Sequence, residues 1–374
     1  MHSEPLTALG HDNSMAVRFG QFNEVMRDRR LRVLLIAELD PRIGWLRRGP
    51  QLRVRHRPRG VRYYLPGELS KLYVVPPSYE RPSVAEITRY VFRQAARLMR
   101  PALGKGFDLV HTFFVDLTRF SAPCVHESDQ SIGQYLEGYL SLDGVSERLL
   151  RPLTEVLVER CPAVVTWSSW AAKGFVVDGI EYSRIHVVPP PMGLGEQRPH
   201  RGVNLLIVGR DPYRKGLDLA LKAFERASRG ADGIARMYVV GPGNAVGERR
   251  GIVTLDRVTE EYLYNELLPR TDVVLAPSRA EAYNLTVLEA MAHGAVPVVS
   301  RVGGLPELVS DAGFVIEPDD VDSLADVVEE LISDGALRAK LSSRAQELIS
   351  VRHDPERVGE SLLKVYNRAV EEGS

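Results

Sequence analysis

The sequence has few cysteines and no long apolar run. Only Cys124 and Cys161 occur among 374 residues, so at most one disulfide can form within the chain. This favours a reducing, cytoplasmic setting over secretion, because small secreted domains are usually rich in disulfides. No apolar segment reaches the roughly 18 residues that a membrane-spanning helix needs, and the N-terminus lacks the apolar core of a signal peptide. We therefore expect a cytoplasmic protein without a transmembrane segment.

Internal repeats, low-complexity tracts and clusters of residues with metal-ligand spacing are also missing from the sequence. We therefore expect no metal site and no required cofactor. Cys124 stands two residues before His126, and we interpret it as a core residue rather than as a metal ligand.

Charge is distributed unevenly along a chain whose net charge is only −1. Residues 1–100 contain 19 Lys or Arg against 9 Asp or Glu, a balance of +10, so residues 101–374 carry −11. Eight arginines lie between Arg42 and Arg62, and a basic helix is predicted over 83–100. This Arg-rich region could contact an anionic membrane on its inner face, or a lipid-phosphate acceptor. The alternative is an ordinary solvated surface. The chain contains 41 arginines against 7 lysines, which looks like an effect of genome composition and favours this alternative.

Nucleic acid is not an expected partner of the Arg-rich region. Proteins that bind single strands combine basic grooves with aromatic side chains on which bases stack. In this sequence the aromatic residues are not interleaved with the basic ones.

The length of the chain predicts two domains, because one compact core seldom serves so many residues. Pro189–Pro191 precede a glycine-rich polar stretch, which is typical of a linker, and place a boundary near 192–202. We predict an N-terminal domain over 1–195, with 1–30 weakly ordered, a second domain over 196–355, and a C-terminal helix over 356–374 that crosses back to the first.

Strands and helices alternate in the second half. We predict strands over 204–209, 236–241, 271–278 and 296–300, and helices over 216–227 and 259–268. The first half is predicted to hold strands over 31–39, 107–114, 122–128, 163–169 and 184–191. Such alternation implies an α/β fold with parallel sheets covered on both faces. Ligands of these folds bind at the carboxyl ends of the strands, in the loops after Gly209, Gly241, Ser278 and Ser300.

Two of these loops contain candidate ligand groups. Arg210 and Lys215 in GRDPYRKG lie at the head of a predicted helix, where two cations and free amides favour an anion. The alternative for this loop is a solvated surface turn.

GPGNAVG, 241–247, suggests dinucleotide binding, but that motif needs a helix directly after the glycines. A strand begins by Ile252 instead, so we interpret the motif as a turn and disfavour a nicotinamide oxidoreductase.

The segment EAYNLTVLEA, 281–290, is the most informative part of the sequence. Asn284 can cap a helix that begins at Leu285, so the amides of Asn284, Leu285 and Thr286 favour a phosphate. Glu281 and Glu289 lie on either side of the N-terminus of this helix, and carboxylates accept hydrogen bonds from paired sugar hydroxyls. The pattern suits a ligand with a sugar at each end of a diphosphate. Alternatively, each glutamate is an ordinary surface acid.

The order of GR…RKG, PSRAEAYNLTVLEAMAHGAVPVVS and RVGGLPELV resembles the retaining GT-B glycosyltransferases of family four. The resemblance covers roughly 204–316, and the first half matches only in architecture. It implies two Rossmann-like domains whose parallel sheets face each other across a deep cleft, with the acceptor on the N-terminal domain. It also implies transfer of a sugar, with retention of configuration, from a UDP-, GDP- or ADP-sugar. The acceptor would be an unknown glycan, lipid-linked or small molecule.

The resemblance also implies roles for individual residues. Arg210 and Lys215 look like the pair that grips the diphosphate, Glu281 like the acid facing the transferred sugar, and Glu289 like the ribose ligand. His126, in PCVHESD, is similar to the active-site histidine of the family. With it, Arg210, Lys215 and Glu281 form the catalytic set. Further donor-binding positions are Gly44, Gly209, Gly241, Arg257 and Val258 beside the base, Ala282, Tyr283, Asn284, Leu285 and Thr286.

Three features depart from the family pattern. Ala282 and Asn284 stand where the family has glycines, Pro190 and Pro191 replace an Asn-Gly pair, and Gly44 is single where the family has two glycines. The altered glycines leave open a non-catalytic nucleotide-sugar-binding protein. A further alternative is a GT-B epimerase, which would share the diphosphate site and act on a nucleotide sugar without an acceptor.

Overall fold

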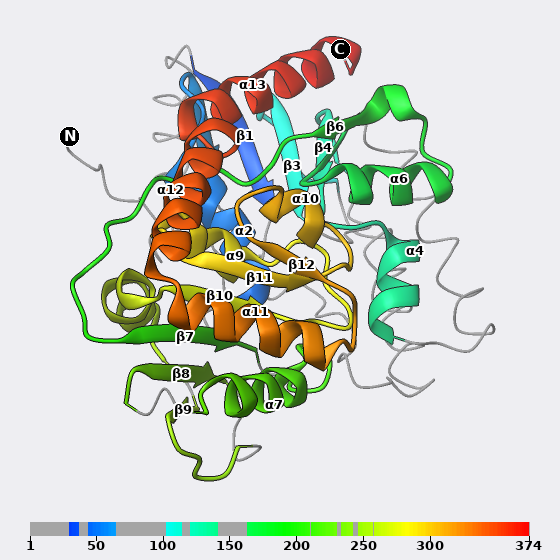
Figure 1. The fold of residues 1–374 in the computed structure, drawn as a ribbon. Coiled ribbons are helices and arrows are strands. Elements are labelled where there is room, and N and C mark those ends of the chain that lie inside the picture. The colour runs from blue at the N-terminus through cyan, green and yellow to red at the C-terminus, as the bar shows by residue number, and fades with distance from the viewer. Residues whose placement is uncertain are drawn as a thin grey trace.

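The computed structural model describes residues 30–36, 44–64, 102–113, 120–140, 163–209, 211–229, 233–241, 246–256 and 258–373 (Figure 1). The predicted helix over 83–100 and the segment 1–29 lie outside these ranges, as do Arg210, Arg257 and Cys161.

The first sheet contains six parallel strands in the order β2-β1-β3-β4-β5-β6. The strands are β1 Leu31–Ile36, β2 Val61–Tyr64, β3 Leu109–Phe113, β4 Cys124–Glu127, β5 Ala163–Thr166 and β6 Ile185–Val187. Their helices are α2 Gly44–Arg55, α4 Ile132–Tyr135 with a π-helical turn over Leu136–Leu140, α6 Ser169–Val177 and the short turn Tyr182–Arg184. The central strands are almost entirely buried, as parallel strands covered on both faces must be.

The second sheet also contains six parallel strands, in the order β12-β11-β10-β7-β8-β9. They are β7 Val203–Val208, β8 Ala235–Val240, β9 Ile252–Leu255, β10 Val273–Ala276, β11 Val296–Ser300 and β12 Phe314–Ile316. The helices are α7 Leu217–Ala227, α8 Glu260–Tyr262, α9 Leu285–Ala292, α10 Leu305–Val309, α11 Val321–Ser333 and α12 Gly335–Arg352. Two parallel α/β sheets confirm the fold class predicted from the alternation of strands and helices.

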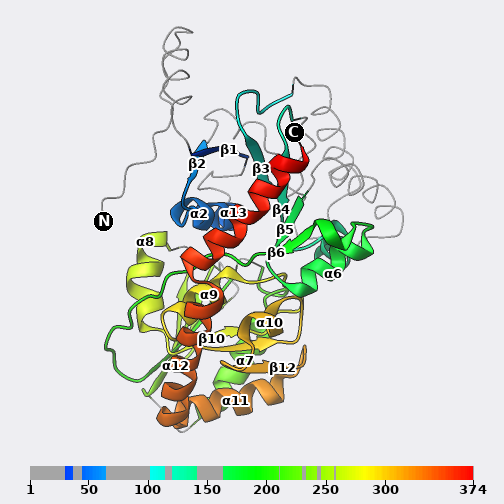
Figure 2. The same ribbon diagram turned by 90° about the horizontal axis from the view of Figure 1, so that it is seen from above.

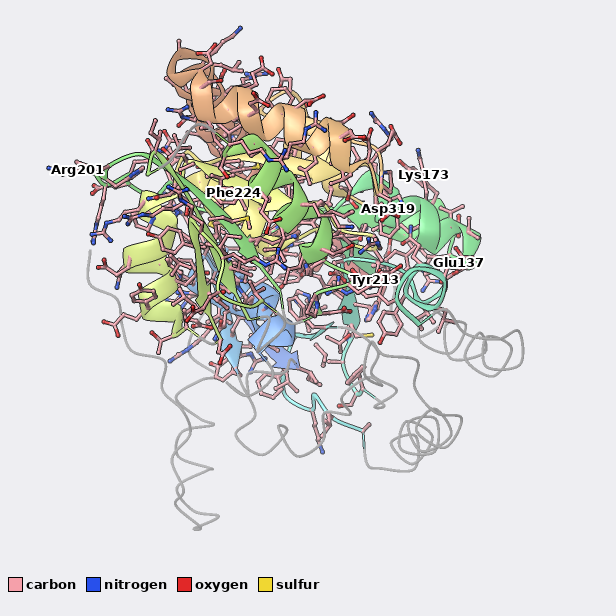
Figure 3. All side chains as sticks on the ribbon, turned by 60° about the horizontal axis from the view of Figure 1, so that its bottom comes forward. Glu137, Lys173, Arg201, Tyr213, Phe224 and Asp319 are labelled. Carbon is pink, nitrogen blue, oxygen red and sulfur yellow. The ribbon has the colours of Figure 1, made fainter. Side chains whose placement is uncertain are left out.

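Two apolar clusters cover the two faces of the second sheet. One contains α7 and α11 and includes Phe224, which is fully buried and is labelled in Figure 3. The other contains α9 and α12, and it also takes in Leu52, Trp167 and Met192 from the first 195 residues. The two sheets are therefore joined by apolar packing on the α9 side.

The C-terminal helix α13, Pro355–Glu372, lies along the first sheet (Figure 2). Val358, Leu362 and Tyr366 pack into the apolar cluster of β1, β3, β4 and β5. The Tyr366 hydroxyl lies 2.6 Å from Nδ1 of His111 and 2.8 Å from the hydroxyl of Tyr63. The last helix of the chain thus completes the core of the first sheet.

Some elements differ from the sequence prediction. The helix expected over 259–268 begins as expected, with the Thr259 side chain capping the Tyr262 amide at 3.1 Å. It then loosens into a π-helical turn over Leu263–Leu267 and a 3₁₀ turn over Leu268–Arg270, where Pro269 cannot donate a helical hydrogen bond. Helix α2 was not predicted, because its arginines and Pro50 obscure the apolar periodicity.

Cys124 in β4 is buried, as expected of a core residue, and is disulfide-bonded. Among the described residues, no helix is long and apolar enough to cross a bilayer.

A buried ion pair fixes α2 against the first sheet. Arg53 donates from Nε and Nη2 to Oε1 of Glu127 at 3.0 and 2.9 Å, and both side chains are at most 1% exposed. Arg53 also donates to the carbonyls of Val188 and Pro189, at the start of the chain segment that joins the two sheets. Trp167 donates to the same Glu127 oxygen at 2.6 Å. This network links α2, β4 and the connecting segment.

Candidate functional site

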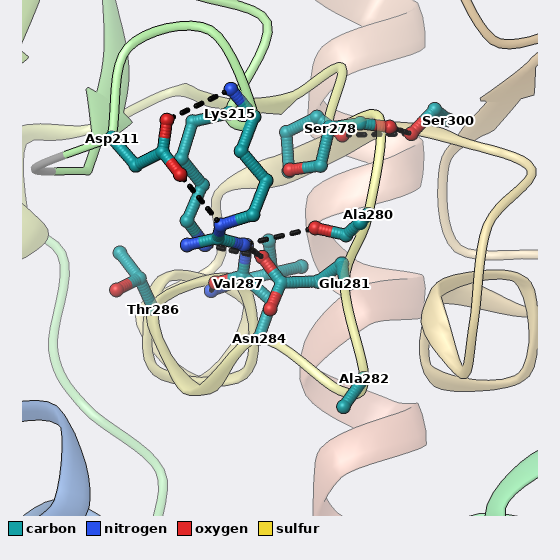
Figure 4. Close-up of polar contacts among 12 residues, drawn as sticks. Asp211, Lys215, Ser278, Ala280, Glu281, Ala282, Asn284, Thr286, Val287 and Ser300 are labelled. Atoms are coloured by element: carbon teal, nitrogen blue, oxygen red, sulfur yellow. Dashed lines mark hydrogen bonds and ion pairs between the residues drawn. The ribbon is translucent and has the colours of Figure 1, made fainter. Parts of the chain in front are cut away.

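Loops after β7 and β10 meet at the carboxyl edge of the second sheet (Figure 4). Lys215 forms an ion pair with Oε2 of Glu281, and Asn284 donates to that oxygen at 3.1 Å. The Arg214 guanidinium lies 3.8 Å from the same atom. Glu281 is 9% exposed, so a largely buried carboxylate stands among two cations and an amide. Lys215, Glu281 and Asn284, which the sequence singled out from separate loops, are brought together.

Glycines permit this close approach of the loops. Gly216 has φ of 66°, and a Cβ there would lie 2.0 Å from the Pro277 carbonyl oxygen. A Cβ at Gly209 would lie 2.5 Å from Cγ of Lys215. Asp211 closes the loop between them by accepting from the Arg214 amide at 3.0 Å. Gly209 therefore lies beside Lys215, and the loop conformation depends on its glycines.

The loop RVGG after β11 closes onto the same site. A Cβ at Gly303 would lie 1.6 Å from the Glu281 carbonyl oxygen, and the Gly304 amide donates to the Ala282 carbonyl at 2.8 Å. The structural reason for these glycines is close contact with another loop, which no local pattern reveals.

Helix α9 begins as the sequence predicted. Asn284 has φ of 69°, and its Oδ1 accepts from the Val287 amide at 3.2 Å. Asparagine tolerates this left-handed conformation better than most residues, which accounts for its presence where the family has glycine. The Leu285 and Thr286 amides are in the first turn, where a helix supplies no backbone acceptor. Leu285 packs against the α9 cluster.

The carboxylate of Glu281 is held in its charged form. Burial alone would raise its pKa, but the charges of Lys215 and Arg214 outweigh burial and lower it. Burial lowers the pKa of Lys215, and the charge of Glu281 opposes that shift. Asp129 lies in the first half of the molecule, and burial together with the charge of Glu281 raises its pKa to about 7.

Glu289 lies inside α9 and is 1% exposed. Tyr264 donates to its Oε1, and Arg48 forms an ion pair with its Oε2. Arg48 also donates from Nη1 to Oγ1 of Thr286 at 3.1 Å. Arg48 belongs to α2, beside the first sheet, so the second glutamate is bound by the opposite half of the molecule.

Tyr139 is a second contribution from the first half. Its hydroxyl accepts from the Ala282 amide at 2.8 Å and lies 3.5 Å from Oε1 of Glu281. The Arg214 guanidinium lies 5.0 Å from the centre of its ring. Sequence reasoning missed Tyr139 and Arg48, because nothing near them in the chain indicates contact with α9.

The interpretation of the Arg-rich region as a solvated surface is wrong for two of its arginines. Arg48 is 18% exposed and Arg53 is 1% exposed, and both are paired with buried glutamates. Arg59, by contrast, is exposed and pairs with Glu356 at the surface. The paired arginines could have been suspected only from the buried acids that they neutralise.

His126 is the third residue of β4 and is 6% exposed. Its Nδ1 lies 3.2 Å from Oγ1 of Thr112. Burial, and then the neighbouring His111, lower the pKa of His126 to about 4. The ring is therefore neutral at pH 7.

The remaining candidate residues have varied surroundings. Tyr283 points into the core, with its ring 5.8 Å from that of Trp167 and its hydroxyl 3.3 Å from Nε2 of His353. Ala282 is buried, Gly241 has φ of 88°, and Val258 packs against the α9 cluster. Gly44 is the first residue of α2. Arg210 and Arg257 lie outside the described residues.

Comparison with solved structures defines the class of fold. A sucrose-phosphate synthase from Thermosynechococcus elongatus superposes with a TM-score of 0.64 at 16% identity, over 92% of this chain and 100% of that one. Anabaena HepE in complex with UDP-glucose superposes with a TM-score of 0.62 at 16% identity, over 91% and 100% of the two chains. The protein has the GT-B fold.

Residues 202–334 match the family model for glycosyl transferases group 1. This region contains Lys215, Glu281 and Glu289. A glycosyltransferase of Methanocaldococcus jannaschii is 29% identical over 179 residues, which are 45% of each chain. The alignment therefore spans less than half the length of this curated relative.

Proposed function

We propose that the protein is a glycosyltransferase that moves a sugar from a nucleoside-diphosphate sugar to an acceptor hydroxyl, with retention of configuration. The observation that carries the proposal is that Lys215, Glu281 and Asn284 lie in contact at the N-terminus of α9. The match of residues 202–334 to the family model for glycosyl transferases group 1 supports the reaction class. The complex of HepE with UDP-glucose makes UDP-glucose the first donor to test.

The charges of the site suit the departure of a nucleoside diphosphate. Breaking the bond between sugar and phosphate builds negative charge on the leaving oxygen. Lys215, Arg210 and the first-turn amides of α9 would stabilise that charge without rearranging solvent. In this role Lys215 turns from Glu281 toward the phosphate.

The two glutamates would hold the two sugars of the donor. Glu281 is ionised and can accept hydrogen bonds from hydroxyls of the transferred sugar once Lys215 turns away. Glu289 would accept from the ribose. His126, neutral at pH 7, would contact the transferred sugar or the acceptor from the first half of the molecule. The acceptor would be a glycan, a lipid-linked molecule or a small molecule.

Thermal stabilisation by UDP, GDP, ADP and TDP tests donor binding. We expect one of them to raise the melting temperature, and Arg210→Ala to abolish the shift. Arg226→Ala, which removes an exposed cation that pairs with Asp322 on the surface, is the matched control and should keep the shift. Stabilisation by NAD and by no nucleoside diphosphate would overturn the proposal.

Catalysis needs a separate measurement. Slow hydrolysis of the bound donor without acceptor is expected of a transferase. Binding of a donor with no hydrolysis of any of them would favour a non-catalytic binding protein. Interconversion of two donor sugars without an acceptor would favour an epimerase.

For the Arg-rich region, flotation with anionic vesicles tests peripheral membrane contact, and no co-migration would remove that idea.

A further inference from the structure

Glu289, the expected ribose ligand, is closed off by groups that are not part of any donor. Its carboxylate is 1% exposed, with Tyr264 on one oxygen and Arg48 on the other. A ribose cannot reach a carboxylate so deeply covered unless one of these groups moves.

The backbone around Arg48 is firmly anchored, so the side chain is the part that can move. Arg53, one and a half turns further along α2, is bound to Glu127 and to two backbone carbonyls. Leu52 packs into the α9 cluster, and Arg55 lies 5.8 Å from the Tyr264 ring centre. A Cβ at Gly49 would lie 2.8 Å from the Trp167 ring, so α2 also contacts that ring closely.

Displacement of Arg48 by a nucleoside alone would be unfavourable. Ribose hydroxyls would satisfy Glu289, but the guanidinium, 18% exposed, would lose its counter-charge. A nucleoside diphosphate brings both replacements at once, hydroxyls for Glu289 and phosphate oxygens for Arg48. Arginine suits this second role because its planar fork matches phosphate oxygens in pairs.

Arg48 is already beside the place where the diphosphate is expected. Its Nη1 donates to Thr286, in the first turn of α9. A change of side-chain conformation, with α2 in place, is therefore enough to carry the guanidinium from Glu289 to a phosphate at this helix mouth.

We propose that Arg48 is a phosphate ligand of the donor that pairs with Glu289 while the site is empty. The donor ribose displaces Arg48 from Glu289, and the donor diphosphate receives it. The inference rests on the proposed function and adds a residue from the first half of the molecule to the donor site. It makes the site select nucleoside diphosphates over nucleosides with the same base.

Binding measurements on Arg48→Ala test the exchange. The probes are the nucleoside diphosphate that stabilises the wild type and the nucleoside with the same base, titrated by calorimetry. We expect the diphosphate to bind roughly tenfold more weakly, because a hydrogen bond to a charged group is lost. The nucleoside should bind as tightly as before or more tightly, because Glu289 is released. The preference for diphosphate over nucleoside should therefore fall by at least the same factor.

Three variants serve as controls. Arg59→Ala removes an exposed arginine of the same half and should change neither affinity. Arg48→Lys keeps the positive charge but lacks the planar fork of arginine. Its preference for diphosphate over nucleoside should therefore lie between those of the wild type and Arg48→Ala. In a Glu289→Gln background, Arg48→Ala should no longer tighten the nucleoside, because no carboxylate remains to be released.

Equal weakening of diphosphate and nucleoside by Arg48→Ala, or no weakening of either, overturns the exchange. If Arg48→Ala does not fold, an unchanged preference in Arg48→Lys overturns it instead. In both cases the wild type still binds the diphosphate, and the proposed function stands. A wild type that binds no nucleoside diphosphate overturns the proposed function and this inference together.

Discussion

The two buried glutamates beside α9 differ in the origin of the cations that balance them. Glu281 pairs with Lys215 and Arg214, which lie in the loop after β7 of the same half of the molecule. Glu289 pairs with Arg48, which lies on α2 in the opposite half. The carboxylate at the expected sugar end is thus neutralised within one half of the molecule. The carboxylate at the expected ribose end is neutralised only when the two halves are packed together.

The position of Arg48 beside Glu289 depends on the buried Arg53–Glu127 pair, which anchors α2 to the first sheet. Arg53→Ala leaves the Glu127 carboxylate buried without its main counter-charge, which costs about 3–5 kcal/mol. We expect a large fall in the unfolding free energy, measured by urea denaturation. Arg59→Ala is the matched control, because it removes an exposed arginine, and it should cost little. A cost for Arg53→Ala no greater than that of Arg59→Ala would contradict the role of the buried pair.

The pH dependence of stability provides a second measurement of the anchor. Burial raises the pKa of Glu127, but Arg53 and His111 outweigh it and lower that pKa from 4.5 to about 2. A lowered carboxylate pKa contributes stability that is present above pH 4.5 and is lost as pH falls toward about 2. Glu127→Gln should flatten the stability profile in that window and lower its plateau at neutral pH.

Removal of the cation on the Glu281 side should affect the reaction more than stability, because Arg214 still lies 3.8 Å from Glu281. Lys215→Ala removes a charge that is expected to stabilise the leaving diphosphate, and we predict a loss of roughly 10²–10³-fold in kcat. Donor hydrolysis or transfer to an acceptor measures it. Lys222→Ala, which removes an exposed lysine of α7, is the control and should retain the wild-type rate. A Lys215→Ala enzyme with wild-type kcat would remove Lys215 from the proposed mechanism.

The junction of the two halves should respond to mild acid. His353 lies there, with Nδ1 2.8 Å from the Pro190 carbonyl and Nε2 3.3 Å from the Tyr283 hydroxyl. Burial lowers its pKa from 6.5 to about 4, so the unfolded chain binds its proton first. Stability contributed by the neutral ring is complete above pH 6.5 and falls as pH drops toward 4.

Chemical denaturation at pH 7.5 and at pH 5 measures this loss, which we expect to be about 2 kcal/mol for His353. His353→Gln should reduce the difference between the two pH values by that amount. His126, whose pKa burial also lowers to about 4, supplies a second loss in the same range and remains in the variant. An unchanged difference in His353→Gln would show that the ring already titrates normally in the folded protein.

The contrast between the glutamates also explains what the sequence could and could not predict. The parallel sheets, the cap at Asn284 and the meeting of Lys215 with Glu281 all follow from patterns within a few dozen residues. Arg48 lies 241 positions before Glu289 in the sequence, so only the tertiary structure brings the two together. Arg48 and Arg53 look alike in an arginine-rich stretch, and burial alone distinguishes them from Arg59.

Tyr139 offers the smallest and most specific test of the comparison, because it is a contact from the first half to the Glu281 loop. Tyr139→Phe keeps the ring beneath Arg214 but removes the acceptor of the Ala282 amide. Loss of one such hydrogen bond costs about 0.5–1.5 kcal/mol, which corresponds to a few-fold change in donor affinity or a small drop in melting temperature. Tyr213→Phe, at an exposed tyrosine stacked on Arg279, is the control. If Tyr139→Phe weakened donor binding as much as Arg48→Ala, the Glu281 side would depend on the opposite half as strongly as the Glu289 side, and the distinction between the two glutamates would fail.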